Sequence, residues 1–137
     1  MSGFNDKVVA EFRAQGGRVG GPFEGAPMIL VHHVGRRSGR EQVTPLMYLP
    51  GNDGTMSIFA SAAGAPGHPA WYFNLTSAGH ATVEVGTETF DVDVRELEGS
   101  ERDEVFAEQV RRYPGFGEYA DKTEGIRTIP VLRLTRR

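Results

Sequence analysis

Three arginines crowd one predicted turn of the chain, inside the stretch HHVGRRSGREQVTPLMY. Arg36, Arg37 and Arg40 lie within five residues of one another, between two apolar runs. Like charges this close repel one another, and a bound anion relieves that repulsion. The glycines of the GRRSG motif let the backbone approach a ligand closely, and Ser38 adds a hydroxyl donor. The turn therefore indicates a phosphate or carboxylate site; the alternative is a solvated hairpin tip whose arginines discourage edge pairing.

A second stretch, FASAAGAPGHPAWYFN, combines small residues with the expected start of a helix. Residues 61–65 leave a strand with side chains that are too small to obstruct a flat ligand. A helix is expected to begin near His68 and Pro69, and helix N-termini favour negative groups. Trp71 and Tyr72 have an alternative explanation, since aromatic residues at this place also pack against the rim of a sheet.

Aromatic residues recur every third position near the C-terminus. Tyr113, Phe116 and Tyr119 flank Pro114 in the segment YPGFGEY, whose two glycines predict a loosely held stretch of chain. Aromatic side chains on such a segment can cover an apolar substrate. Packing of Tyr113 in the core is the alternative.

The remaining reactive side chains do not form a catalytic or metal-binding pattern. His32 and His33 are neighbours on a predicted strand, so they point to opposite faces and cannot share one metal ion. The chain has no cysteine, which excludes disulfides, zinc-thiolate sites and iron–sulfur clusters. Asp91 and Asp93 alternate with apolar residues, which is typical of a solvated strand face. We therefore predict neither a metal site nor a catalytic residue.

The composition of the 137 residues bounds the class of protein. With 39% hydrophobic and 24% charged residues, the chain is predicted to form a single domain over residues 1–137. Its net charge of -3 offers no basic footprint for a nucleic acid. No window resembles a signal peptide or an integral membrane segment, so a cytoplasmic protein is expected. Contact of the opening helix with a membrane surface stays open, although that helix has few cations.

Hydrophobic periodicity predicts the elements that must position these residues. Helical spacing of apolar residues opens the chain, and shorter apolar or alternating runs bounded by glycine and proline follow. Strands are expected at 27–34, 43–50, 55–61, 81–85, 88–97 and 128–134, and helices at 4–13, 69–79 and 100–113. About six strands with helices around them suit a small closed or partly closed barrel.

The three stretches, in this order, resemble the deazaflavin-dependent nitroreductase family. The matching segments are GRRSGREQVTPLMYL, ASAAGAPGHPAWYFNL and YPGFGEYADKTEGIRTIPV. The resemblance implies a mainly β fold with peripheral helices, a split β-barrel that binds coenzyme F420, an 8-hydroxy-5-deazaflavin. It further implies an enzyme that passes a hydride from reduced F420 to an apolar aromatic acceptor, either a quinone or a nitroaromatic compound. Because the cofactor carries the chemistry, the absence of an acid–base pair is expected.

The resemblance also assigns residues. The turn at residues 35–40, which we call the basic turn, would hold the phosphate and acidic tail of F420 through Arg36, Arg37, Ser38, Gly39 and Arg40. The deazaflavin ring would be lined by Thr44, Pro45, Ser61, Ala62, Ala63 and Gly64. Trp71 and Asn74 would lie on the supporting helix, and Tyr113, Phe116 and Tyr119 over the substrate. The family usually has Pro-Arg where this chain has Glu41 and Gln42, and sometimes has a lysine at Ala62, so cationic contacts to the tail are fewer here.

Two other functions fit the same residues. A split-barrel oxidoreductase that uses flavin mononucleotide (FMN) needs a phosphate site but no room for a long acidic tail. A non-catalytic protein could carry a deazaflavin or a lipophilic molecule in the mouth of the barrel. Many split barrels pair, so a homodimer is a further expectation left open by the sequence.

Overall fold

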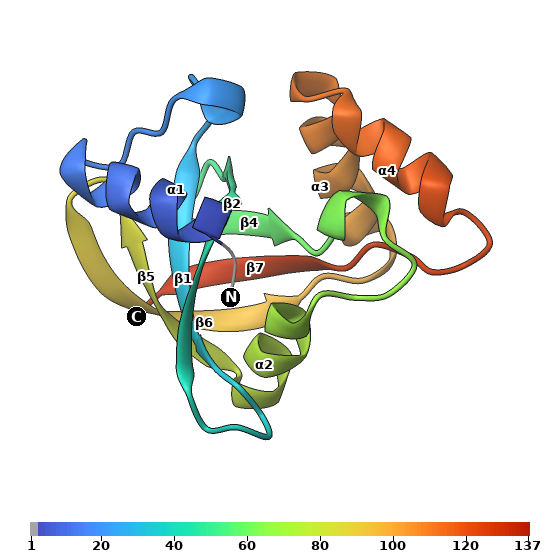
Figure 1. The fold of residues 1–137 in the computed structure, drawn as a ribbon. Helices are drawn as coiled ribbons and strands as arrows, with labels where there is room; N and C mark the ends of the chain where they lie inside the picture. The colour runs from blue at the N-terminus through green and yellow to red at the C-terminus, as the bar shows by residue number, and fades with distance from the viewer. Residues whose placement is uncertain (1–2) are drawn as a thin grey trace.

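One antiparallel sheet organises the computed structural model, which describes residues 3–137. Its seven strands stand in the order β2-β1-β5-β6-β7-β4-β3 (Figure 1). The strands are β1 (Met28–Val34), β2 (Glu41–Met47), β3 (Leu49–Pro50), β4 (Met56–Phe59), β5 (His80–Val85), β6 (Glu88–Glu96) and β7 (Val131–Arg136). The helices are α1 (Gly3–Ala14), α2 (Ala70–Ala78), α3 (Gly99–Arg112) and α4 (Gly115–Thr123), with short 3₁₀ turns η1 (Gly21–Phe23) and η2 (Ala62–Gly64).

The two edge strands β2 and β3 are consecutive in the chain, and this connection curls the sheet. Only Tyr48 separates them, although they lie at opposite ends of the strand order. The Tyr48 N–H donates to Pro27 O at 3.1 Å, so the chain leaves β1 there and joins β4. The single strand predicted at 43–50 is therefore two, which raises the count from about six to seven. The mainly β split-barrel class with peripheral helices is confirmed.

Three apolar clusters hold the helices against this curled sheet. Val31, Ile58 and Val83 are fully buried inside it, and α2 covers them with Trp71 and Leu75. α1 packs on the other side of β1 and β2, and α3 with α4 packs over β4 and β7. Burying side chains on this scale is the main stabilising contribution, at about 2 kcal/mol for each large residue. The helices therefore sit firmly around the rim of the sheet (Figure 1).

Most predicted elements are confirmed, and the aromatic segment near the C-terminus is not. α2 ends at Gly79, which adopts a left-handed φ of 78°, and the predicted hairpin forms as β5 and β6. The prediction of a loosely held segment around Tyr113 was wrong, because residues 115–123 form the regular helix α4. Phe116 packs edge-on against Phe59 with ring centroids 5.8 Å apart, which anchors that helix. Within residues 3–137, no helix has the length and apolar character needed to cross a membrane.

Candidate functional site

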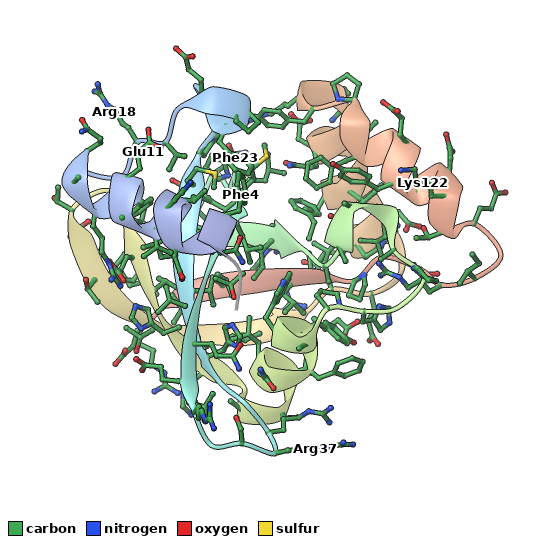
Figure 2. All side chains as sticks on the ribbon, in the orientation of Figure 1. Phe4, Glu11, Arg18, Phe23, Arg37 and Lys122 are labelled. Atoms are coloured by element: carbon green, nitrogen blue, oxygen red, sulfur yellow. The ribbon has the colours of Figure 1, made fainter. Side chains whose placement is uncertain are left out.

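The basic turn forms the tip of the β1–β2 hairpin. Its backbone is closed by hydrogen bonds from the Gly35 N–H to Arg40 O and from the Gly39 N–H to Gly35 O, both 3.0 Å. A Cβ at Gly35 would lie 2.4 Å from Ser38 Oγ, so a larger residue there would displace the Ser38 hydroxyl. The three arginines of the turn are exposed, and Arg37 projects from the end of the hairpin (Figure 2). Within residues 3–137 none of the three forms an ion pair, which leaves their charge available to a ligand.

A groove of about 500 Å³ lies beside the basic turn. One wall is the turn itself, including Arg36, Arg37 and Ser38, and the other is the start of α2 with Phe73 and Asn74. The Arg36 guanidinium lies 5.0 Å from the centre of the Phe73 ring, a cation–π contact that orients the side chain along the groove. The structure thus brings together four of the predicted cofactor-binding residues, namely Arg36, Arg37, Ser38 and Asn74.

A buried polar chain connects the basic turn to β2. Asn74 Oδ1 accepts a hydrogen bond from the Arg36 N–H at 3.2 Å, and its Nδ2 lies 3.0 Å from His33 Nδ1. His33 Nε2 then lies 2.8 Å from Thr44 Oγ1. His33 and Asn74 are only 5% and 7% exposed. Burial, and secondarily the neighbouring His32, lowers the pKa of His33, so this ring is favoured in its neutral form.

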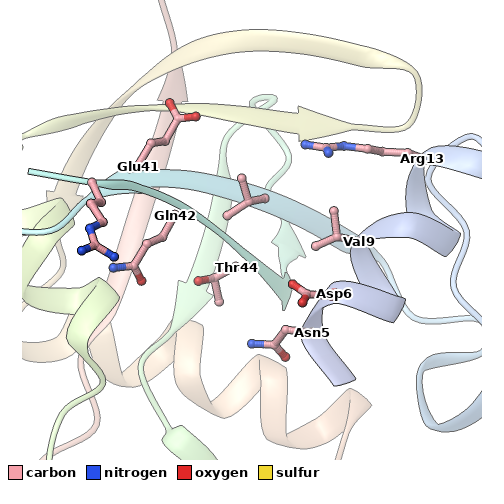
Figure 3. Close-up of a pocket in the computed structure, with 9 residues that line it drawn as sticks. Asn5, Asp6, Val9, Arg13, Glu41, Gln42 and Thr44 are labelled. Atoms are coloured by element: carbon pink, nitrogen blue, oxygen red, sulfur yellow. The ribbon is translucent and has the colours of Figure 1, made fainter. Parts of the chain in front are cut away.

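A second groove, of about 580 Å³, runs between α1 and the edge strand β2 (Figure 3). Arg40 and Thr44 line it opposite residues of α1. Gln42 lines both grooves, so the two grooves adjoin at this residue. In Figure 3, Gln42 and Thr44 leave the same side of β2, whereas Glu41 leaves the other. There the Glu41 carboxylate lies 3.6 Å from His32 Nδ1, so this acid lines the second groove from the side of β2 opposite to Gln42 and Thr44.

The small residues predicted to line a ring belong to a loop, residues 60–68, that Arg127 holds in place. The Arg127 guanidinium donates to the carbonyl oxygens of Ala60, Ser61 and Ala65 at 2.9–3.0 Å, and we call residues 60–68 the Arg127 loop. Inside it, Ala62 and Ala63 adopt left-handed φ values of 47° and 54°. Such angles are unfavourable for alanine and persist where the surroundings enforce them.

Gly64 brings the Arg127 loop against α4. It has a φ of 84°, and a Cβ there would lie 2.8 Å from Lys122 Cδ and 3.5 Å from Tyr119 Cα. Only glycine therefore allows this approach. Figure 1 shows the 62–64 turn beside α4. The 62–64 turn, part of the predicted ring-lining set, and the predicted substrate residue Tyr119 are thus neighbours.

His68 links the Arg127 loop to the basic turn. Its ring lines the first groove, and its Nδ1 lies 2.9 Å from Arg127 Nη1. Since a guanidinium only donates, Nδ1 must be the acceptor, which leaves the ring proton on Nε2. Burial, followed by the Arg127 charge, lowers the pKa of His68 and favours the neutral ring. His68 is therefore a fixed, uncharged hydrogen-bond donor beside Arg36 and Arg37.

Other predicted residues lie outside these two grooves. Trp71 is 8% exposed and packs in the core, where it supports α2. Pro45 pairs with Leu30 on the edge strand β2, as expected for a residue without an N–H. Phe116 and Tyr119 pack edge to face with ring centroids 5.3 Å apart beside α3, and Tyr113 occupies the C-cap position of that helix.

Three residues of the site were missed by sequence reasoning. His33 was considered only as a metal ligand, whereas its neighbours show a polar link between two strands and a helix. His68 marked a predicted helix start and was given no role in the site. Arg127 lies in a stretch without periodicity, 62 residues from one of its partners, so the sequence carries no sign of its contacts.

Comparisons with known proteins agree with this geometry. The family model of F420H2-dependent quinone reductases matches residues 5–136. An F420H2-dependent quinone reductase of Mycobacterium tuberculosis is 31% identical over 130 residues, which cover 93% of this chain and 87% of that protein. A solved F420H2-dependent reductase, FDR-A, is 38% identical with a TM-score of 0.69 and covers 79% of this chain and 93% of its own.

A further solved structure, described as a domain-swapped dimer, is 33% identical with a TM-score of 0.71 and covers 94% of this chain and 92% of its own. The family model matches nearly the whole chain, which establishes the family to which the chain belongs. The chain belongs to the F420H2-dependent quinone reductases, enzymes whose cofactor is coenzyme F420.

Proposed function

We propose that this chain, as one F420-binding domain over residues 1–137, transfers a hydride from reduced F420 to a quinone or a nitroaromatic acceptor. One observation carries the proposal. Three arginines without acidic partners line two adjoining grooves beside β2, and Thr44 lines the second of them. A multiply charged tail would neutralise the arginines, while a ring attached to that tail would lie near Thr44.

The residues present fit the cofactor. Guanidinium groups make strong, paired hydrogen bonds to phosphate and carboxylate oxygens, which suits Arg36, Arg37 and Arg40. Ser38 and the N–H of Gly39 would add donors at the same turn. We assign the ring to the side chains of Thr44 and Pro45 and to the small residues of the Arg127 loop, Ser61, Ala62, Ala63 and Gly64. The helix α2, with Trp71 and Asn74, would support this arrangement from below.

The chain's own part in the reaction would be binding and exclusion of water. When bound, reduced F420 supplies the hydride. The protein has to hold ring and acceptor in contact, because positioning removes much of the entropic barrier to such a transfer. Within residues 3–137 no group of acidic residues and histidines could hold a metal ion.

The acceptor would lie between the Arg127 loop and α4. Gly64 approaches Tyr119 closely, and Phe116 packs edge to face against Tyr119, so a flat apolar molecule would find aromatic surface there. The hydroxyl groups of Tyr113 and Tyr119 could donate to the oxygen atoms of a quinone or a nitro group. We propose these three aromatic residues as the substrate-binding set.

Binding and turnover test the proposal separately. Titration of the purified protein with F420 and with FMN, followed by fluorescence, should give the tighter binding for F420, because the basic turn favours the more anionic ligand. Tighter binding of FMN would indicate the flavin alternative instead. Oxidation of reduced F420 should then be measured against a panel of quinones and nitro compounds. Binding without turnover of any acceptor would leave a carrier protein.

Self-association is a separate part of the proposal. The solved relative that is described as a domain-swapped dimer supports a homodimer for this chain as well. Light scattering coupled to size-exclusion chromatography should give twice the 15.0 kDa mass of one chain. A mass of one chain at all concentrations would contradict it.

A further inference from the structure

We infer that His33 is a positioning residue that turns the hydroxyl proton of Thr44 into the groove between α1 and β2. There Thr44 donates a hydrogen bond to an acceptor atom of the bound ligand. On the proposed function, on which this part rests, the acceptor is a carbonyl oxygen or a ring nitrogen of the deazaflavin. The inference depends on the polar chain from Arg36 to Thr44.

The direction of every hydrogen bond in that chain follows from its first member. The backbone N–H of Arg36 can only donate, so the atom of Asn74 that faces it, at 3.2 Å, must be the oxygen. The amide nitrogen of Asn74 then faces His33 Nδ1 at 3.0 Å and donates to it. Since Nδ1 accepts, a neutral His33 carries its proton on Nε2.

The remaining step fixes the hydroxyl of Thr44. His33 Nε2–H donates to Thr44 Oγ1 at 2.8 Å, so this oxygen already serves as an acceptor. Its own proton must point elsewhere, and among residues 3–137 no group accepts a hydrogen bond from it. Thr44 is half-buried and lines the second groove, where its side chain leaves β2 beside that of Gln42 (Figure 3). The Thr44 hydroxyl is therefore available to donate a hydrogen bond into that groove.

The opposite arrangement would leave a buried clash. If Thr44 donated to His33 Nε2, the ring proton would move to Nδ1 and face the amide hydrogens of Asn74. Rotation of the Asn74 amide would restore that bond but would place its NH2 group against the Arg36 N–H. With His33 and Asn74 almost fully buried, water cannot relieve such a contact, and an unmade buried hydrogen bond is costly. One arrangement is thus strongly favoured.

The polar chain from Arg36 to Thr44 also connects the basic turn with the groove that Thr44 lines. The same Asn74 that orients His33 holds the backbone of the basic turn through Arg36. A shift of the turn on anion binding would therefore reach Thr44 through two rigid, buried side chains. This gives His33 a role in the site without direct contact between its ring and the ligand.

Nitrogen NMR of the histidine side chains tests the first half of the inference in the free protein. We expect His33 to show a neutral ring at pH 7 with its proton on Nε2. The Asn74→Leu variant, which removes both the donor to Nδ1 and the acceptor for Arg36, should lose this preference. A proton on Nδ1, or a charged ring, in the wild type would contradict the inferred direction of the hydrogen bonds between Asn74, His33 and Thr44.

Paired substitutions of Thr44 test the second half. Thr44→Val keeps the shape of the side chain and removes the hydroxyl, so we expect F420 to bind about tenfold more weakly. Thr44→Ser keeps a hydroxyl and should bind within about twofold of the wild type. In a His33→Gln background, whose folding is checked by thermal denaturation, Thr44→Val should cost less than in the wild type because the hydroxyl is no longer directed.

The outcomes separate this inference from the proposed function. Normal binding of F420 by the wild type with unchanged affinity of Thr44→Val would overturn the role of Thr44 and leave the function intact. Failure of the wild type to bind F420 would overturn the function and the ligand assignment together. In that case the NMR result would still decide whether His33 directs the hydroxyl.

Discussion

The basic turn and the Arg127 loop use arginine in opposite ways. In the turn, three guanidinium groups are exposed and none has an acidic partner within residues 3–137. In the loop, the single guanidinium of Arg127 donates hydrogen bonds to three carbonyl oxygens and to the ring of His68. The two regions face each other across the first groove, which His68 and Arg36 both line.

This contrast distinguishes an arginine that stabilises the fold from arginines that are available to bind a ligand. A guanidinium saturated by backbone carbonyls fixes the shape of a loop, and here it holds two alanines in left-handed conformations. Guanidinium groups left together without anions raise the local positive potential and attract one. If the distinction is right, substitutions in the two regions should separate stability from binding.

The largest effect is expected for Arg127→Ala. The loss of a charged donor to three carbonyl oxygens and to His68 should lower the free energy of unfolding by about 3 kcal/mol, since each charge-assisted bond is worth about 1.5–3 kcal/mol and water replaces part of the loss. Urea denaturation at neutral pH measures this. Arg127→Lys keeps the charge but cannot reach all four partners, so it should recover only part of the stability. A loss below about 1 kcal/mol for alanine would contradict a structural role.

Arg36→Ala should show the reverse pattern. Removing one cation from the basic turn should weaken F420 binding by about 2 kcal/mol, or roughly 30-fold, and the effect should shrink at high salt. Stability should change by less than about 1 kcal/mol, the usual worth of an exposed cation–π contact such as that with Phe73. Fluorescence titration at two salt concentrations measures the binding.

A matched control for Arg36 is available at the far end of the molecule. Arg18 is also exposed and forms no ion pair within residues 3–137, and Figure 2 shows it well away from Arg37. Arg18→Ala should leave F420 binding unchanged. Equal weakening by both substitutions would mean that the overall charge of the protein, and not the basic turn, attracts the ligand.

The sequence predicted the local elements of this site better than their contacts. Glycines around three arginines, and an apolar run on each side, were enough to predict the hairpin and its basic turn. Pro69 and Gly79 marked the ends of α2 within one residue, because proline fixes its own φ and glycine accepts the left-handed φ of 78° at the end of the helix. These features depend on neighbours in the chain, which a sequence displays directly.

Contacts between distant segments could not be predicted in this way. Arg127 reaches residues about sixty positions earlier, and His33 meets Asn74 across 41 positions. The glycines of α4 predicted a loose segment, but Phe116 anchors it through Phe59, a partner on the distant strand β4. Tertiary packing overrides local propensity in such cases.

A third prediction uses the two histidines that connect the regions. Burial lowers the pKa of both His33 and His68 below the usual 6.5, so an unfolded chain takes up protons before the folded one does. Stability from this source is complete above about pH 6.5 and is lost as the pH falls below it. Urea midpoints should therefore decrease between about pH 7 and pH 5. Since His33 is the more deeply buried, His33→Gln should remove more of this decrease than His68→Gln, and an equal effect would contradict the order.

The smallest effect concerns the strain that Arg127 maintains at Ala62. With a φ of 47°, alanine there costs about 1 kcal/mol more than glycine in the folded state, while glycine adds about 0.5 kcal/mol of entropy to the unfolded chain. Ala62→Gly should therefore raise the free energy of unfolding by about 0.5 kcal/mol. Ala65, at the end of the same turn, has an ordinary φ of -61°, so Ala65→Gly should lower stability by a similar amount. Opposite signs for one chemical change, measured by urea denaturation, would show that the loop is held against its local preference, and a loss in both would show that it is not.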